Sequence, residues 1–435
     1  MNDRVAVVGG GITGLSVAWF LAEQGAQVTL FDGAPGLGGL SVATDYGEFT
    51  WDRFYHVIAP HDRALLDLLQ QLDLHDQVDW TPTRQAVWLD DRVHPLNGAL
   101  DLLRLPGLSL LDKIRLGLLV FAGKRDLPEA VLSGQSSADW LRRRCGERAY
   151  QRFWRHLLRA KLGDAATTVS ARFIHSTLRR LASARKSTGG GERFGYVRGG
   201  YSKVLERFVQ RLRDRGVVLR AATPVSRVTA VPRGGVQVES AADAETFDRA
   251  VVTLPNPQLA RVVTDLAPAD AARLGSTPYL GVLCTVVVGR APLSPNYILN
   301  LCDDALAITG VIETTNVVAR EHTAGRTLVY LPRYAVAGSA AFAQSDAEVQ
   351  ARALGDLARI FPQTRDGWLL RAVVHRTSFI QAIPLRAAPP VAPPREVVAG
   401  KVYCVNNAQL PACILNNHDC IGLARAAVAA LAERR

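Results

Sequence analysis

The sequence has few cysteines and no pair of them in a Cys-x-x-Cys motif. Six cysteines are spread along the 435 residues, at Cys145, Cys284, Cys302, Cys404, Cys413 and Cys420. Zinc sites and redox-active disulfides usually need closely spaced cysteines. We therefore expect reduced thiols in an intracellular, cytoplasmic protein, and no metal site.

Long uncharged apolar runs are also missing. No stretch of about 18 apolar residues is free of charge, so we predict no transmembrane helix. No basic segment precedes an apolar run at the N-terminus, so we predict no signal peptide. No internal repeat is visible. With 48% hydrophobic and 21% charged residues, the chain has the composition of a globular protein of two or three domains.

Lysine is scarce, and the basic charge is local. The net charge is +11, and arginine supplies most of the 51 basic residues. Residues 141–198 hold fifteen Lys or Arg and three Asp or Glu, so the rest of the chain is nearly neutral. This region indicates either an anionic partner, such as a phosphate or carboxylate, or a solvated face of Arg-rich helices. No nucleic-acid module accompanies it, so we predict no nucleic-acid partner.

The N-terminal residues have the pattern of a βαβ unit, with a strand over 4–8, a helix over 13–24 and a strand over 27–31. Gly9, Gly11 and Gly14 between the first strand and the helix fit G-x-G-x-x-G. Gly9 permits a tight turn, Gly11 lets the backbone approach a pyrophosphate, and Gly14 lets the helix pack on the strand. The helix N-terminus then faces the phosphates.

Two further features narrow the type of dinucleotide. Asp32 ends the second strand, where its carboxylate can accept the hydroxyl groups of a ribose. Gly38 and Gly39 follow shortly after and allow a second close approach of backbone to cofactor; a plain surface loop is the alternative. We therefore predict an FAD site.

These glycine elements resemble those of the FAD-dependent oxidoreductases of the amine oxidase, protoporphyrinogen oxidase and phytoene desaturase superfamily. Leu40 stands where that superfamily usually has Arg. Gly199-Gly200 resembles its Gly-Gly element before a helix, and residues 223–228 resemble the strand whose backbone, around Val225, contacts the adenine. Residues 250–257 resemble the strand that returns to the nucleotide domain.

The C-terminal segment is similar to that of the superfamily in shape. The resemblance implies a strand over 401–405 and then Asn406 and Asn407, with Asn407 where Asp is usual. It implies a helix from Asp419 whose backbone around Cys420–Gly422, and so Gly422, faces the flavin. It also implies FAD held without a covalent bond, although Cys404, Cys413 and Cys420 lie near the expected site.

The order of elements predicts an α/β fold. We expect a discontinuous Rossmann-type FAD-binding domain with an inserted mixed α+β substrate domain. The FAD-binding parts are 1–60, 191–256 and 395–435; the insert has a helical part, 61–190, and a β-rich part, 257–394. Further helices are predicted over 62–74, 109–121, 137–160, 169–184, 201–215, 346–360 and 419–433. Further strands are predicted over 217–219, 225–231, 236–238, 250–254, 280–289, 297–301, 306–312 and 327–331. Residues 187–191 and 388–394 are expected to be connectors.

Candidate catalytic residues are few, because a flavin carries most of the chemistry itself. In the superfamily, the stretch holding Tyr55 and His56 runs toward the flavin. His56 is a candidate general base, or alternatively a hydrogen-bonded structural histidine. Arg198 is a candidate for contact with an anionic substrate, or alternatively a surface arginine. His418 either contacts the flavin or precedes the helix cap.

Residues 96–121 are strongly apolar and interrupted by Pro106-Gly107. In superfamily members with lipophilic substrates, this region docks on membranes. We expect either peripheral contact with the inner face of the membrane, helped by nearby basic residues, or a helix packed in the core.

Three functions remain open. The first is FAD-dependent dehydrogenation, by hydride transfer to flavin N5, of a hydrophobic or lipid-linked small molecule. The second is a flavin-dependent isomerase resembling UDP-galactopyranose mutase, acting on a nucleotide sugar. The third is a non-catalytic flavin-binding protein. Because only one dinucleotide fingerprint is visible, we expect oxygen or a quinone as the electron acceptor.

Overall fold

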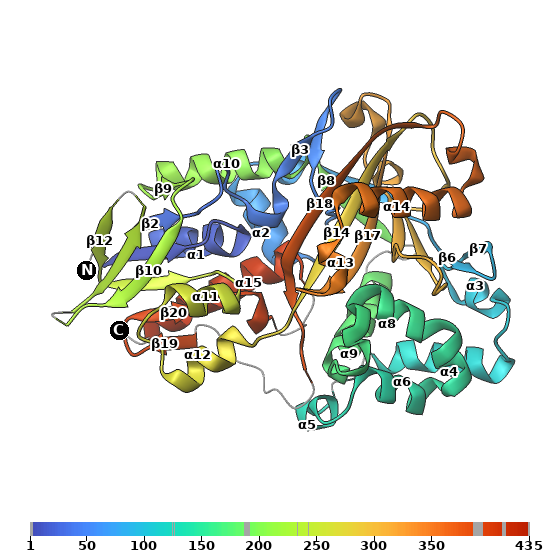
Figure 1. Ribbon diagram of the computed structural model, residues 1–435, viewed down its shortest axis with the longest axis horizontal. Coiled ribbons are helices and arrows are strands. Elements are labelled where there is room, and N and C mark those ends of the chain that lie inside the picture. Colours follow the sequence, from blue (N-terminus) through green and yellow to red (C-terminus); the bar gives the residue numbers. More distant parts are fainter. Residues whose placement is uncertain are drawn as a thin grey trace.

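The computed structural model describes residues 3–123, 125, 127–186, 192–232, 234–241, 243–385, 395–410 and 415–433. The predicted connectors 187–191 and 388–394 both lie wholly outside the described residues. The chain forms two lobes, and both labelled termini lie in the lobe at the left of Figure 1.

The left lobe is built on a six-stranded sheet in the order β19-β20-β13-β1-β2-β9. Its strands are Arg395–Val398, Val402–Cys404, Arg249–Val252, Arg4–Val8, Gln27–Phe31 and Val218–Arg220. All neighbours pair in parallel except β19 and β20. Three separate segments of the chain therefore share one sheet, which confirms the predicted discontinuous Rossmann-type domain.

The two faces of this sheet are covered differently. Val5 and Val7 of β1 pack against helices α1, α10 and α15, which span Ile12–Glu23, Gly200–Asp214 and Asn417–Glu433. Ala6 and Val8 face the opposite way, toward an antiparallel sheet of β10, β11 and β12. Those strands span Val225–Ala230, Val236–Ser240 and Ala244–Phe247. Helices α11, Asn256–Val262, and α12, Pro268–Gly275, cover the same face. The alternation along β1 thus divides two cores.

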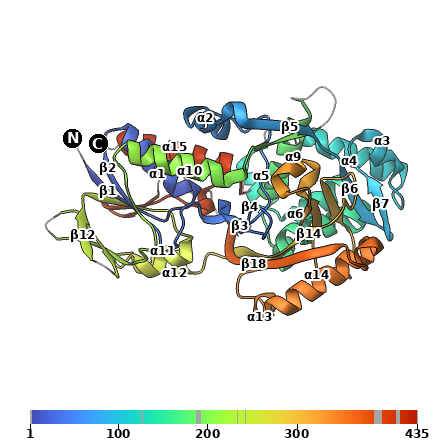
Figure 2. The ribbon, with the colours of Figure 1, turned by 90° about the horizontal axis from the view of Figure 1, so that it is seen from above.

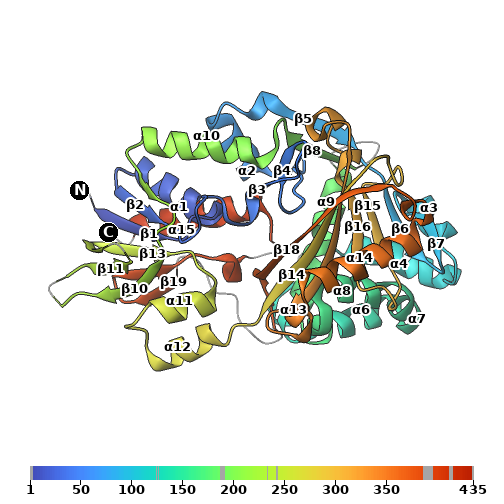
Figure 3. The ribbon, with the colours of Figure 1, turned by 45° about the horizontal axis from the view of Figure 1, so that its top comes forward.

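The right lobe is built on a seven-stranded sheet in the order β18-β14-β17-β16-β15-β6-β7. Its strands are Leu369–Ala382, Tyr279–Gly289, Thr327–Val336, Gly310–Glu313, Ile298–Leu301, Gln85–Leu89 and Arg92–Pro95. Its neighbours are antiparallel except β15 and β6. Helices α13, Ala340–Ala343, and α14, Asp346–Ile360, lie beside this sheet in Figure 3.

Seven helical segments gather against the other side of the seven-stranded sheet, at the lower right of Figure 1. They are α3, Ala99–Arg104; α4, Leu110–Ala122; α5, Glu129–Ser133; α6, Ser137–Cys145; α7, Glu147–Ala149; α8, Arg155–Leu162; and α9, Ala171–Lys186. Their apolar sides bury Trp140, Leu141 and Leu158 with Leu280 of β14. A mixed α+β domain is thus inserted between parts of the nucleotide domain.

Two small sheets and several short helices complete the described structure. Strands β3, Ala43–Asp45, and β4, Thr50–Asp52, form a hairpin. Strand β5, Val78–Pro82, pairs with β8, Arg193–Val197. The short 3₁₀ helices are η1 Gly39–Ser41, η2 His75–Gln77, η4 Gly163–Thr167, η5 Thr314–Asn316, η6 Arg320–Thr323, η7 Pro362–Thr364 and η8 Asn407–Gln409.

The single helix predicted over 137–160 is wrong. Helix α6 ends at Cys145 because Gly146 adopts a left-handed φ of 85°, and a new helical run begins at Glu147. That run passes through a π-helical turn, η3 at Tyr150–Trp154, before α8. The glycine redirects the chain, so the basic side chains of the two runs lie on separate helices.

Helix α2, Arg63–Gln71, lies in the nucleotide lobe. Its Leu65, Leu68 and Leu69 are buried in the same core as α1 and α15. The predicted substrate-domain part 61–190 therefore includes a helix that packs with the nucleotide domain. Its leucine spacing predicts a helix with one buried face, and that spacing alone does not say which core the face joins.

Candidate cofactor and active site

The first glycine loop joins β1 to α1 in a conformation that needs glycine. Gly9 has a φ of 111°, which side-chain-bearing residues rarely adopt. A Cβ added at Gly14 would overlap the carbonyl oxygen of Gly9. Helix α1 begins after Gly11 with no side-chain cap and no acidic residue in its first turn. Its first N–H groups are therefore available to an anion.

The second glycine pair lies directly against this loop. Gly38 donates its N–H to the carbonyl of Gly10 at 2.8 Å, and a Cβ added at Gly39 would lie 3.0 Å from the Cα of Gly11. A Cβ added at Gly11 would meet nothing nearer than the Cα of Gly39, at 3.9 Å. Apart from its chain neighbours, no described atom lies closer than 3.9 Å to the Cβ position of Gly11, so this position is open. This open backbone surface fits the pyrophosphate of a dinucleotide.

Asp32 stands at the end of β2, beside both glycine elements. Its Oδ2 accepts the N–H of Gly10 at 2.5 Å, and its Oδ1 accepts the N–H of Ala34 at 2.7 Å. Each carboxylate oxygen has a second lone pair for a ribose hydroxyl. The carbonyl of Asp32 accepts the N–H of Thr223, at 2.8 Å. Val225 begins β10 two residues later, so the predicted adenine-contacting strand runs beside Asp32.

Asn406 and Asn407 follow β20, and the structure gives them different roles. The buried amide of Asn406 donates to the carbonyl of Leu254 at 2.7 Å and to Oδ1 of Asn256 at 2.8 Å. Its own Oδ1 accepts the N–H of Ala408 at 3.1 Å. These bonds hold the loop after β20 and use the whole side chain, so we assign Asn406 a structural role at this site.

Asn407 keeps one polar atom free. Its Nδ2 donates to the carbonyl of Ile380 at 2.8 Å. Its Oδ1 is buried and has no hydrogen-bond partner among the described residues. A buried acceptor without a donor costs free energy, so it fits a ligand that brings a hydroxyl. An oxygen without a described partner thus stands where the resemblance implies a contact with the phosphate or ribityl chain of FAD.

The last helix, α15, points its N-terminus at the second glycine element. Asn417 in its first turn donates to Oγ of Ser41 in η1 at 3.2 Å. Asn416 caps the helix, because its Oδ1 accepts the N–H of Asp419 at 2.8 Å. Gly422 lies one turn further along, with nothing within 4 Å of an added Cβ.

His418 contacts α2. Its Nδ1 accepts the N–H of Ala64 at 3.0 Å, at the start of that helix. His418 therefore does not precede the helix cap: it lies in the first turn of α15, after Asn416, and its Nδ1 binds the backbone of α2.

His56 lies within a buried polar group that the sequence analysis did not identify. Its Nδ1 is 3.7 Å from Oδ2 of Asp52, and its Nε2 is 3.5 Å from Oγ of Ser41. The ring also packs on Tyr201, with 4.8 Å between centroids. Asp52 is buried, and its Oδ1 accepts the N–H of Tyr201 at 2.8 Å. His56 therefore lies between a carboxylate and a hydroxyl, and its Nδ1 forms no hydrogen bond within the described residues. An imidazole placed in this way is a candidate to accept a proton.

Tyr55 points toward the seven-stranded sheet. Its hydroxyl hydrogen-bonds that of Tyr334 on β17 at 2.7 Å. Burial raises the pKa of Tyr334 well above its usual value, so this phenol stays protonated. Tyr55 and His56 are adjacent in sequence but belong to different contacts: one faces the substrate lobe, and the other faces the glycine elements.

Arg198 is on the surface and already paired. Its guanidinium donates to both carboxylate oxygens of Asp79, with distances from 2.9 to 3.1 Å. The side chain is 52% exposed. The pairing lowers the pKa of Asp79. A substrate anion would have to compete with this bidentate pair, so the structure favours the surface-arginine alternative.

The cysteines near the site are buried. Cys404 and Cys420 form no disulfide, and burial raises the pKa of each thiol to about 12. Cys413 lies outside the described residues. A thiol with so high a pKa is a poor nucleophile at neutral pH, since the thiolate is the reactive form.

The described residues contain neither a metal-binding cluster nor a helix able to span a membrane. No group of three or more His, Cys, Asp or Glu is arranged to hold a metal ion within those residues. None of the helices there has the length and apolar character needed to cross a membrane.

Four residues with hydrogen bonds or close contacts in the site were not predicted from the sequence: Ser41, Asp52, Asn417 and Tyr334. Ser41 comes two residues after Gly39, and Asp52 comes four residues before His56. Proximity to recognised residues was therefore an available signal for both. Tyr334 and Asn417 are far from Tyr55 and Ser41 in sequence, so only the fold brings them there.

Comparison with known proteins agrees with this geometry. The family model for flavin-containing amine oxidoreductases matches residues 12–401. A carotenoid phi-ring synthase of Streptomyces griseus is 27% identical over 411 residues, which cover 85% of this chain and 76% of that protein.

Two solved structures show the same fold. One, described as a protoporphyrinogen oxidase of Exiguobacterium sp. 255-15, has a TM-score of 0.79 and 18% identity and covers both chains fully. Reduced UDP-galactopyranose mutase has a TM-score of 0.76 and 16% identity and covers 100% of this chain and 96% of its own.

The family match covers most of the chain. The open backbone between the Gly9–Gly14 loop and Gly38–Gly39, which we call the glycine cradle, fits the family's cofactor. The chain therefore belongs to the flavin-containing amine oxidoreductase family and is an FAD-dependent oxidoreductase.

Proposed function

We propose that the protein dehydrogenates a hydrophobic or lipid-linked small molecule at a membrane surface. Bound FAD supplies the hydride acceptor, at N5 of the flavin. The observation that carries the substrate class is an exposed aliphatic face on helices α3 and α4, which we call the aliphatic face. It consists of Leu100, Leu103, Leu110, Leu111, Ile114 and Leu118.

These six side chains are between 48% and 68% exposed. The two helices are linked directly, because Nζ of Lys113 donates to the carbonyl of Leu103 at 2.6 Å. Figure 2 shows α3 and α4 together at the end of the molecule away from the termini. A cluster of large aliphatic side chains in water is unfavourable, and such patches mark contact surfaces.

Exposed basic side chains outnumber acidic ones beside the aliphatic face, where Asp101 of α3 is half-buried. Arg104 and Arg115 are exposed, whereas Asp112 is buried beneath the helix and hydrogen-bonded to Ser109. Exposed cations around an apolar surface suit the anionic lipids of an inner membrane face. This supports peripheral membrane contact through residues 96–121, with a lipophilic substrate reaching the enzyme from the bilayer.

The relative in Streptomyces griseus supports the same class of substrate. Its name states that it acts on a carotenoid, which is an extended apolar molecule. Similarity at 27% identity does not carry the substrate itself across. We therefore propose the class, a hydrophobic lipid, and not the compound.

The chain's own residues would hold the substrate and receive its proton. Dehydrogenation removes a hydride and a proton from the substrate. We assign the proton to His56, whose Nδ1 lies 3.7 Å from the carboxylate of Asp52 without a hydrogen bond between them. Tyr55 and Tyr334 line the adjoining wall of the seven-stranded sheet. The two electrons then leave to oxygen or a quinone, in keeping with the single dinucleotide fingerprint.

The test is anaerobic bleaching of the oxidised flavin absorbance in the purified holoenzyme. A total lipid extract in detergent micelles should reduce the flavin, and the aqueous extract of the same cells should not. Bleaching by the aqueous extract alone would contradict the lipid class. Conversion of UDP-galactopyranose by the dithionite-reduced enzyme, with no net flavin oxidation, would favour the isomerase instead.

We also infer that FAD is held without a covalent bond, because the described thiols near the site are buried and protonated. Acid precipitation should release the flavin into the supernatant. Yellow colour retained in the pellet would contradict this inference and would point to Cys413.

A further inference from the structure

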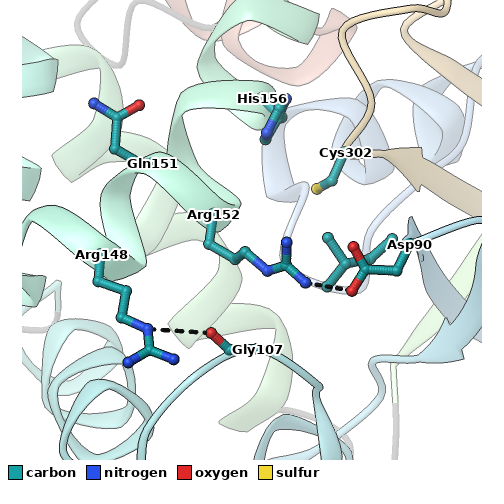
Figure 4. A pocket seen from close by; sticks show the side chains of 8 residues that line it. Asp90, Gly107, Arg148, Gln151, Arg152, His156 and Cys302 are labelled. Atoms are coloured by element: carbon teal, nitrogen blue, oxygen red, sulfur yellow. Dashed lines mark hydrogen bonds and ion pairs between the residues drawn. The ribbon is translucent and has the colours of Figure 1, made fainter.

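A second pocket lies in the substrate lobe, apart from the glycine cradle. It has a volume of about 510 Å³ and opens between the connection from α3 to α4 and the basic helical run that starts at Glu147. Figure 4 shows Arg148 and Arg152 reaching from this run toward Gly107 and Asp90. No residue that lines it belongs to the FAD site, so the function proposed above does not use it.

Arg148 presents most of its donors to solvent. Its Nε donates to the carbonyl of Gly107 at 3.3 Å and lies 3.8 Å from Oδ2 of Asp112. Its side chain is 64% exposed, and neither Nη atom has a recorded partner within the described part of the chain. The carboxylate of Asp112 is already engaged by Ser109, whose Oγ donates to it at 2.7 Å. Arg148 is thus anchored at one edge with its other edge free.

Arg152 lies one turn further and closes the pocket. It forms an ion pair with Asp90 through one Nη. Its Nε is buried without an acceptor among the described residues. Gly107 has a φ of 71°, and a side chain there would run into the Arg152 guanidinium. The absence of a side chain at Gly107 therefore leaves room for the Arg152 guanidinium at the pocket wall.

The pocket borders the aliphatic face. Gly107 lies between Leu103 and Leu110, which are the last exposed leucine of α3 and the first of α4. A molecule that placed apolar chains against these leucines would bring its polar end to Arg148. Guanidinium groups bind phosphate oxygens in pairs of parallel hydrogen bonds, more strongly than a point charge does.

We propose that this pocket binds the phosphate headgroup of an anionic membrane lipid, with Arg148 as the main contact and Arg152 as the second. The aliphatic face enters the bilayer beside it. This site rests on the membrane contact proposed above and specifies its chemistry. Asp90 and Asp112 neutralise part of the charge, so the site favours a single phosphate diester over a highly charged ligand.

The test is co-sedimentation of the holoprotein with vesicles of phosphatidylcholine, with and without phosphatidylglycerol. The key variant is Arg148→Lys, which keeps the charge and removes the fork. The matched control is Arg143→Lys, exposed on α6 in the same basic region but outside the pocket. Phosphatidylglycerol should strengthen binding, Arg148→Lys should weaken that binding about fivefold or more, and Arg143→Lys should leave it within about twofold.

Four outcomes would contradict the assignment of the pocket to a lipid headgroup. Equal behaviour of the two variants would mean diffuse attraction between charges. Binding unaffected by phosphatidylglycerol, or no vesicle binding at all, would leave no role for a headgroup. Calorimetry with inorganic phosphate separates the remaining source: phosphate binding lost in Arg148→Lys, with vesicle binding unchanged, would assign the pocket to a soluble anion.

Failure of this proposal is separable from failure of the proposed function. Vesicle binding does not involve turnover, and the bleaching test measures flavin reduction in detergent micelles, which does not depend on docking to a bilayer. Flavin spectra of each variant show whether the fold and cofactor are retained.

Discussion

Two glycines in the first loop are needed for different reasons. At Gly14 the limit is the protein itself, because an added Cβ overlaps the carbonyl oxygen of Gly9. At Gly11 the φ of −71° suits any residue, and the nearest atom to an added Cβ is 3.9 Å away. The space at Gly11 is therefore reserved for something other than the chain.

We predict that alanine at Gly14 mainly lowers stability, whereas alanine at Gly11 mainly weakens FAD binding. Gly14→Ala should lower the free energy of unfolding of the apoprotein by about 1–3 kcal/mol, because the overlap forces the backbone apart. Gly11→Ala should change it by about 1 kcal/mol or less, yet weaken FAD binding about tenfold or more. Urea unfolding and flavin titration measure the two quantities. Unchanged FAD affinity in Gly11→Ala would contradict the cradle.

His56 is the residue we expect to matter most for turnover. His56→Gln should lower kcat about 100-fold or more, since a positioned base contributes roughly that much, while leaving bound flavin and its spectrum in place. Asp52→Asn should shift the pH profile of kcat, because the carboxylate that lies 3.7 Å from Nδ1 of His56 becomes a neutral amide. His75→Gln, at a histidine that is 55% exposed, is the matched control. A loss of flavin in His56→Gln would show that the residue is structural.

At the scale of elements, the end of β16 carries a buried acid. Glu313 accepts the N–H groups of Leu293 and Ser294 at 3.1 and 3.0 Å. Burial outweighs these bonds and raises the pKa of Glu313 from 4.5 to about 7. The folded state therefore holds a proton that the unfolded chain releases. The stability from this proton is complete below pH 4.5 and is lost as the pH rises through 7.

We predict that the free energy of unfolding of the natural protein falls relative to Glu313→Gln between pH 4.5 and 7, by roughly 1 kcal/mol per pH unit at the steepest. Urea unfolding of both proteins across this range measures it. His375, whose pKa burial lowers to about 4, acts in the opposite direction and is common to both. The difference between the two proteins isolates Glu313, and a constant difference would contradict the raised pKa.

Elements defined by nearby residues were predictable, and elements defined by distant pairing were not. β1, α1 and β2 follow from apolar runs and glycines within 31 residues. Strand β8 pairs with β5, which joins Val78 to Val197, so its partner lies across the helical insert. Strand β18 is mostly half-exposed and lacks a clear alternation of burial. Both strands depend on tertiary contacts that a local pattern does not contain.

The same division applies to the site. The sequence indicated the glycine elements and Asp32, because a phosphate-binding turn requires particular residues at fixed spacing. It did not indicate the contact of Ser41 with Asn417, which joins residues from opposite ends of the chain. It also could not separate Asn406 from Asn407, because their roles depend on which amide the backbone of Leu254 reaches.

At the scale of the whole molecule, FAD should stabilise the fold substantially. We propose that its site is made from the first glycine loop, β10 and the segment after β20, so the cofactor would join segments that are remote in sequence. Free FAD at 100 times its Kd should raise the free energy of unfolding by about 2.7 kcal/mol. Scanning fluorimetry of apoprotein with added FAD measures the rise in unfolding temperature. Added NAD is the control, and an equal rise with NAD would contradict FAD selectivity.

The position of α15 has a consequence for how the enzyme is made. Its helix fills the core beside α1 and contacts Ser41, yet it follows every other described element of the chain. Ribosomes add roughly 5–20 residues per second, so β1 and its glycine loop emerge long before the helix that completes their core. The nascent chain therefore waits with an unfinished nucleotide domain, and flavin capture becomes a late event in biogenesis, after translation has passed Asn417.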